Sequence, residues 1–135
     1  MSNLLDNIKS SEGFRSKVYQ CTEGHDTIGY GFAIKDLVLS RDICDTILEA
    51  KVSELKLRIQ QKFPFISDLP DEVQNVVIEM CYQMGVSGFS KFKKTISLLE
   101  SKEFLSASKE MLDSRWAKQT PNRAKKLSDI VKYVG

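Results

Sequence analysis

Cysteine, histidine and tryptophan are scarce in this chain of 135 residues. Its three cysteines, Cys21, Cys44 and Cys81, are far apart, whereas disulfide frameworks and zinc sites use closely spaced pairs. We therefore expect neither, and we expect synthesis in a reducing compartment. The single histidine, His25, is expected at the surface of a hairpin. No metal and no other cofactor is expected.

Long apolar runs are also missing. No stretch approaches the roughly 20 residues of a membrane span, and the opening MSNLLDNIKS lacks the basic start and apolar middle of a secretory signal. We expect no signal peptide and no stable membrane association. Any export should depend on another component.

A strong excess of one charge is absent as well, since the net charge is +2. Basic residues gather around residues 91–94 and 115–126, and such clusters attract anionic polymers through their field. A solvated basic face is the simpler interpretation of each cluster. No nucleic-acid-binding motif accompanies them, so nucleic acid is not an expected partner.

What the sequence does contain is an α+β pattern that is mostly helical. We predict one domain over 1–135, with an N-terminal antiparallel sheet lobe (1–39), a connecting helix (40–63) and a helical lobe (64–135). Strands are predicted at 18–21, 26–30 and 32–34. Helices are predicted at 3–11, 40–62, 71–84 (ended by Gly85), 90–100, 102–112 and from Thr120-Pro121 onward.

The stretch from Ser11 to Gly31 holds the groups most suited to chemistry. Glu12 ends the first predicted helix, and Gly13 terminates it. A carboxylate there faces the negative end of the helix dipole, which favours its protonated form, and shielding by Phe14 would add to this effect. These are the conditions that a general acid needs.

Two further residues of this stretch are placed by strand alternation. Asp26 and Thr27 point to opposite faces, so Asp26 should face outward if Thr27 lines the site. Cys21 is predicted on the first strand, where a buried structural cysteine is the simpler alternative to a functional thiol.

Three segments in order resemble the phage-type (T4-type) lysozymes of glycoside hydrolase family 24. They are Glu12-Gly13 with Thr27-Ile28-Gly29-Tyr30-Gly31, then Tyr82-Gln83-Met84-Gly85, then Ser114-Arg115-Trp116 with Gln119-Thr120-Pro121-Asn122-Arg123. The resemblance covers nearly the whole chain. It implies a lysozyme-like fold and hydrolysis of the β-1,4 bond between N-acetylmuramic acid and N-acetylglucosamine in peptidoglycan.

The resemblance also implies residue roles. Glu12 takes the position of the family's proton donor, and Thr27 that of the threonine that positions water. The family's second carboxylate falls at Cys21, which is the main departure. A thiolate at Cys21 would serve as base or nucleophile, or the thiol would hold a water with Thr27. The substitute carboxylates are Asp26 and Glu23.

Substrate contacts are implied at seven further positions, of which Ala33, Thr95 and Glu110 differ in residue type from the family. The positions are Gly31, Phe32, Ala33, Tyr82, Gln83, Thr95 and Glu110. Arg115, Trp116 and Arg123 are expected to brace the helical lobe.

The preferred function is a monomeric bacteriophage endolysin. It would stay in the cytoplasm of the host bacterium until a pore releases it to the cell wall. A lytic transglycosylase that uses Glu12 alone is the first alternative, because the muramic C6 hydroxyl replaces water there. A non-catalytic peptidoglycan-binding protein with a lysozyme fold is the second.

Overall fold

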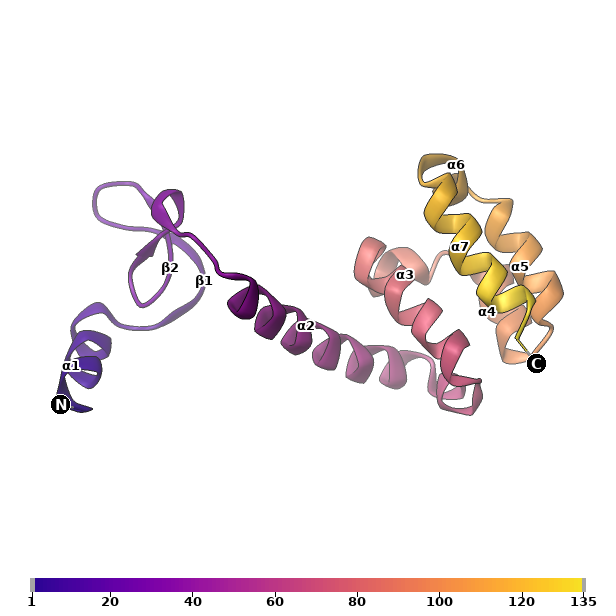
Figure 1. The fold of residues 1–135 in the computed structure, drawn as a ribbon, viewed down its shortest axis with the longest axis horizontal. Helices are drawn as coiled ribbons and strands as arrows, with labels where there is room; N and C mark the ends of the chain where they lie inside the picture. Colours follow the sequence, from indigo (N-terminus) through magenta and orange to yellow (C-terminus); the bar gives the residue numbers. More distant parts are fainter. Residues whose placement is uncertain (1, 135) are drawn as a thin grey trace. The chain divides into compact units, whose positions relative to one another are not determined.

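The computed structural model describes residues 2–134 and divides into two compact units, Met1–Cys44 and Asp45–Gly135. The first unit carries a small sheet, and the second is helical (Figure 1). Helix α2 (Arg41–Lys62) runs from one into the other. This arrangement confirms the predicted α+β, lysozyme-like class. Each unit is described by itself below.

The first unit contains α1 (Ser2–Glu12), β1 (Arg15–Gln20), β2 (Asp26–Gly29), β3 (Phe32–Ala33) and a 3-10 turn, η1 (Ile34–Asp36). The strands are antiparallel in the order β1-β2-β3. β1 begins at Arg15 rather than at the predicted residue 18, because Arg15 pairs with Gly29 beyond an irregularity between Arg15 and Tyr19. It also ends before Cys21, which therefore lies in the turn and not on the strand.

Helix α1 ends where its sequence predicts. Gly13 has a left-handed φ of 73°, and its N–H donates to the Lys9 carbonyl oxygen at 2.9 Å. This is the single-bond form of the glycine helix stop, in which only glycine adopts the backbone conformation without strain. Glu12 is thereby held at the last position of the helix.

The second unit follows from α2 and packs around α3 (Asp71–Phe89). Helix α2 begins after Ser40, whose Oγ accepts from the Ile43 N–H at 3.2 Å. Pro64 starts the 3-10 segment η2 (Pro64–Asp68), so the helix stops before it as predicted. The remaining helices are α4 (Lys93–Glu100), α5 (Phe104–Leu112), α6 (Arg115–Gln119) and α7 (Pro121–Lys132).

Several details of the helical unit differ from the prediction. Helices α4 and α5 begin at Lys93 and Phe104 rather than at residues 90 and 102. Gly85 breaks α3 with φ 81° and ψ 158°, but a further helical turn continues to Phe89. The short helix α6 was not predicted, because five residues are too few to show a period. Ser114 caps it by accepting the Ala117 N–H at 3.1 Å.

The core of the second unit lies on the predicted face of α3. Val73, Val76, Val77, Met80 and Cys81 are all buried. They pack with buried residues of the later helices, among them Leu99, Met111, Trp116, Leu127 and Val131. Burial of these apolar side chains is the main source of the unit's stability.

The loop after α4 offers a direct test of backbone strain. Lys102 has a left-handed φ of 59°, while its N–H and that of Glu103 donate to the carbonyls of Leu99 and Leu98 at 3.0 and 2.8 Å. This is a Schellman helix stop, which normally carries glycine. We expect Lys102→Gly to raise the free energy of unfolding by about 1 kcal/mol, because the left-handed conformation costs a side-chain-bearing residue about that much.

Chemical denaturation of the wild type and Lys102→Gly measures this gain. Ser101→Gly is the matched control, since Ser101 has ordinary helical angles (φ −82°, ψ 0°) and the new glycine only adds chain entropy to the unfolded state. Equal destabilisation by both substitutions would contradict the assignment of strain to Lys102.

Candidate functional site

Glu12 lies against the turn between β2 and β3. A Cβ atom added at Gly31 would collide with the Glu12 carboxylate oxygen Oε2, so only glycine leaves room for this carboxylate. Gly31 also has a left-handed φ of 75°. Glu12 itself is exposed within this unit, and Phe14, 64% exposed, does not shield it as expected. The Phe14 ring packs on Tyr30 instead, with ring centroids 5.3 Å apart.

The orientation of strand β2 agrees with the prediction. Thr27 is buried, with 4% of its surface exposed, whereas Asp26 is exposed. Thr27 pairs with Tyr19 on β1 and with Ala33 on β3, so it sits in the middle of the sheet. Asp26 faces away from this side and is a poor substitute for the missing carboxylate.

Cys21 lies at the start of the turn between β1 and β2. The turn is closed by two bonds, from the Cys21 N–H to the His25 carbonyl at 2.9 Å and from the Gly24 N–H to the Cys21 carbonyl at 2.8 Å. Hydrogen bonds from the backbone N–H groups of His25 and then Glu23 lower the pKa of the Cys21 thiol, against a smaller opposing effect of desolvation.

The Thr27 hydroxyl is the third partner of the Cys21 sulfur and also lowers its pKa. This hydroxyl donates to the His25 carbonyl at 2.9 Å. Since it has one proton, it can accept from the Cys21 thiol while bonded to His25, or turn its proton to a Cys21 thiolate. The Cys21 thiol and the Thr27 hydroxyl are therefore close enough to interact.

Cys81 shows the opposite environment for a thiol. It is 1% exposed in the core of the second unit, and burial raises its pKa to about 12, although Arg58 acts in the other direction. A thiol in that state is inert as a nucleophile. The pKa of the Cys21 thiol is thus lowered and that of the Cys81 thiol raised, because the two lie in different environments.

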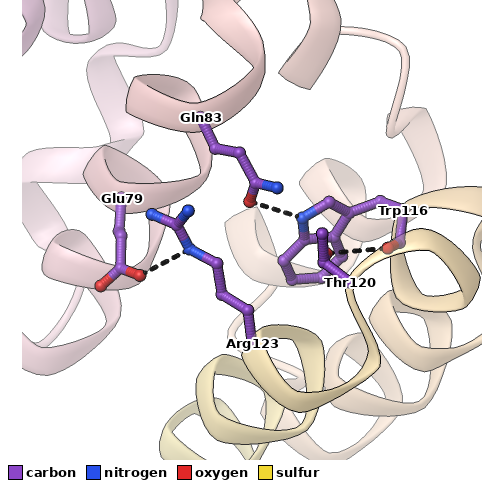
Figure 2. A network of polar contacts seen from close by, with 5 residues as sticks. All are labelled: Glu79, Gln83, Trp116, Thr120 and Arg123. Carbon is purple, nitrogen blue, oxygen red and sulfur yellow. Dashed lines mark hydrogen bonds and ion pairs between the residues drawn. The ribbon is translucent and has the colours of Figure 1, made fainter.

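In the second unit, a polar network joins α3 to the last two helices (Figure 2). Gln83 Oε1 accepts from the Trp116 indole N–H at 2.9 Å, and Arg123 Nε donates to Glu79 Oε2 at 2.9 Å. Thr120 Oγ1 donates to the Trp116 carbonyl at 3.0 Å. Trp116 and Arg123 therefore brace the helices, and Gln83 uses its carbonyl oxygen in that bracing.

Thr95 and Glu110 come together in a cavity of about 270 Å³ that lies within the second unit. Its lining residues are Lys91, Phe92, Lys93, Lys94, Thr95, Glu110, Asp113, Ser114, Arg115 and Trp116. Lys94 pairs with Glu110 at 3.4 Å. Among the described residues, Lys91, Lys93 and Arg115 have no ion pair within 4.0 Å, which leaves the cavity with a positive excess. We call it the basic cavity.

The other predicted contacts are distributed over both units. Phe32 and Ala33 form β3 beside Thr27 and Gly31. Tyr82, 48% exposed, lines a separate cavity of about 220 Å³ with residues of α2. The lysines and Arg115 of the basic cavity were not predicted as ligand contacts. Their clustering in the sequence was the only signal, because packing of α4 against α5 creates the cavity.

Metal binding finds no support in the part of the chain that the structure describes, where no three His, Cys, Asp or Glu side chains are grouped for an ion. His25 is exposed, as expected, and its Nε2 lies 3.8 Å from a Glu23 carboxylate oxygen. Over residues 2–134, no helix is long and apolar enough to span a membrane.

Residues 9–132 match the family model of phage lysozyme. The chain belongs to the phage lysozyme family. Among its relatives is Probable T4-type lysozyme 1 of Dictyostelium discoideum, which is 26% identical over 97% of this chain and 94% of the relative. Probable T4-type lysozyme 2 of the same organism is 29% identical over 96% of this chain and 94% of the relative. Pre-baseplate central spike protein Gp5 of Enterobacteria phage T4 is 26% identical, and 27% of its length is covered.

Family membership gives the class of reaction. This member of the phage lysozyme family is a glycoside hydrolase of the lysozyme type, whose substrate is peptidoglycan. The alignments span 161 and 163 positions against 135 residues in this chain, so these relatives carry segments that this chain lacks.

Proposed function

We propose that this lysozyme hydrolyses the β-1,4 bond between N-acetylmuramic acid and N-acetylglucosamine, with Glu12 as general acid and Cys21 in place of the usual second carboxylate. The observation that carries the proposal is the place of Cys21 in the turn beside β2, the strand of Thr27, where backbone hydrogen bonds lower the pKa of its thiol. Glycoside hydrolysis needs one group that gives a proton and a second that activates water. Glu12 and the Cys21–Thr27 pair supply both.

The proposed reaction combines protonation of the leaving oxygen with attack by a water molecule. Glu12 transfers its proton to the glycosidic oxygen while the bond from that oxygen to C1 of the muramic acid breaks, and the electron pair stays on the oxygen. A water held by the Thr27 hydroxyl and the Cys21 sulfur attacks C1, and the Cys21 thiolate takes its proton. Exchange with solvent then returns a proton to Glu12 and removes one from Cys21.

Gly31 supports the first step. Its missing side chain leaves room for the Glu12 carboxylate, so the acid can lie next to the turn that follows β2, the strand that carries Thr27. Correct placement of a reacting group contributes as much to the rate as its chemistry.

The proposed biological setting is that of an endolysin. We propose that it acts as a monomer, remains in the bacterial cytoplasm and reaches the wall through a holin-type pore. Membership of the phage lysozyme family supports this setting.

Mass spectrometry of purified sacculi after digestion tests the reaction. Muramic ends that are reducing, one water heavier than the anhydro form, are expected. Anhydro-muramic ends would identify a lytic transglycosylase in which Glu12 works alone. No soluble products, with the protein bound to the sacculi, would identify a binding protein.

The basic cavity is proposed to hold anionic groups of the wall, and this predicts an effect on substrate binding. We expect Lys91→Gln/Lys93→Gln to raise KM several-fold at low ionic strength with little change in kcat, because the lost attraction acts on binding and is screened by salt. Steady-state rates on soluble glycan strands at low and high salt measure this change in KM.

The control is the double variant Lys109→Gln/Lys118→Gln, which removes the same charge from exposed positions outside the cavity. An equal effect of both pairs would show that only net charge matters.

A further inference from the structure

Three contacts near Glu12 share one residue, Tyr30. Its ring centroid lies 5.6 Å from the Lys9 ammonium nitrogen and 5.3 Å from the Phe14 ring centroid. Phe32 approaches it edge-on at 6.4 Å, with the ring planes at 79°. Tyr30 thus contacts α1 on one side and β3 on the other.

Two of the residues that Tyr30 contacts, Lys9 in α1 and Phe14 just after it, flank the acid in the sequence. Lys9 lies three residues before Glu12, about one helical turn, and Phe14 lies two residues after it, beyond the Gly13 stop. An ammonium over an aromatic face and a tilted ring pair each contribute a preferred geometry as well as buried area. Together they fix both the last turn of the helix and the direction in which the chain leaves it.

The next residue, Gly31, receives the Glu12 carboxylate. Gly29, on the other side of Tyr30, has a left-handed φ of 70°, and Gly31 has one of 75°. Tyr30 therefore lies in a tight turn, between two glycines that both have left-handed backbone angles. The ring holds the helix end while the adjacent glycine leaves room for the acid.

We propose that Tyr30 is a positioning residue for Glu12, acting through its ring. This inference rests on the proposed function, in which Glu12 is the general acid. The Tyr30 hydroxyl makes no hydrogen bond with the described residues, so the ring and not the hydroxyl carries the role. Loss of the ring would free the end of α1 and let the carboxylate leave its place beside Gly31.

The test compares Tyr30→Ala and Tyr30→Phe in the full chain, with kcat and KM measured separately on soluble glycan strands. Tyr30→Ala is expected to lower kcat about 10- to 100-fold with KM within about threefold, since misplacement of a reacting group by about 1 Å costs up to about 100-fold. Tyr30→Phe keeps the ring and is expected to retain kcat within about twofold.

Two controls make the outcome decisive. Tyr133→Ala removes a similar ring beside Lys132, at 5.1 Å, from the second unit and is expected to leave kcat unchanged. Tyr30→Leu keeps apolar volume without an aromatic face. It is expected to lower kcat even where circular dichroism and thermal unfolding match the wild type, which covers the case in which the alanine variant does not fold.

Wild-type kcat in both Tyr30→Ala and Tyr30→Leu, or a loss in Tyr30→Phe equal to that in Tyr30→Ala, would overturn the inference. A failure of the proposed function is distinguishable, because Glu12→Gln would then hydrolyse glycan at the wild-type rate. If Glu12→Gln is inactive and the Tyr30 variants are not impaired, only the positioning role is wrong.

Discussion

Glu12→Gln is expected to lower the rate of glycan hydrolysis by about 10³-fold and to leave binding to sacculi unchanged. Glutamine has the shape of the acid but no proton to give to the leaving oxygen, and a positioned acid contributes about 10² to 10⁴ in rate. Because the carboxylate lies beside Gly31 on the surface of its unit, the amide fits the same space.

Turbidity loss of sacculi measures the rate, and co-sedimentation measures the binding. Glu49→Gln makes the same chemical change at an exposed position of α2 and serves as the control. Hydrolysis by Glu12→Gln at the rate of the control would rule out Glu12 as the acid. Loss of binding together with activity would indicate a folding defect instead.

The pH dependence of the rate is expected to report Cys21. The thiolate is the form that accepts the proton of water, so the rate rises with pH as Cys21 ionises. Since the donors from His25, Glu23 and Thr27 lower the pKa of Cys21, this rise should come at lower pH than the ordinary thiol value of about 8.5 would give.

Cys21→Asp is expected to shift the acidic side of this profile downward by several pH units, because an ordinary aspartate ionises near pH 4. Rates at pH 5 should therefore be at least about tenfold higher in Cys21→Asp than in the wild type. Identical profiles for the two proteins would mean that Cys21 does not titrate in the reaction.

Alkylation gives an independent measure of the same thiol. Iodoacetamide is expected to inactivate a Cys44→Ser protein at a rate that follows Cys21 ionisation, since Cys44 is exposed and would otherwise react as well. Cys81 should remain unmodified in the folded protein, because burial raises its pKa to about 12. Cys21→Asp/Cys44→Ser should keep its activity under the same treatment.

The sequence predicted those parts of the fold and site that depend on short stretches. Glu12 at a helix end and Thr27 opposite Asp26 follow from local patterns, namely the glycine stop and the alternation of strand residues. The buried face of α3 likewise follows from its helical period. Each of these is contained within about one element.

The features that were missed depend on contacts between elements. The donors around Cys21 come from the backbone of a turn, which residue types do not reveal. The ring of Tyr30 could not be assigned to Glu12 until α1 and the β2–β3 turn were seen together. In the same way, residues 91–95 and 110–116 form the basic cavity only through the packing of α4, α5 and α6.

The most direct test of the central claim is the kcat of Cys21→Ala relative to wild type and Cys21→Asp on the same glycan strands. Alanine removes the sulfur without adding bulk, so a steric explanation does not apply. A loss of at least about 100-fold in Cys21→Ala, with activity kept in Cys21→Asp, is predicted, since both thiolate and carboxylate can accept the proton of water. Wild-type kcat in Cys21→Ala would contradict the account and leave Glu12 as the single catalytic group.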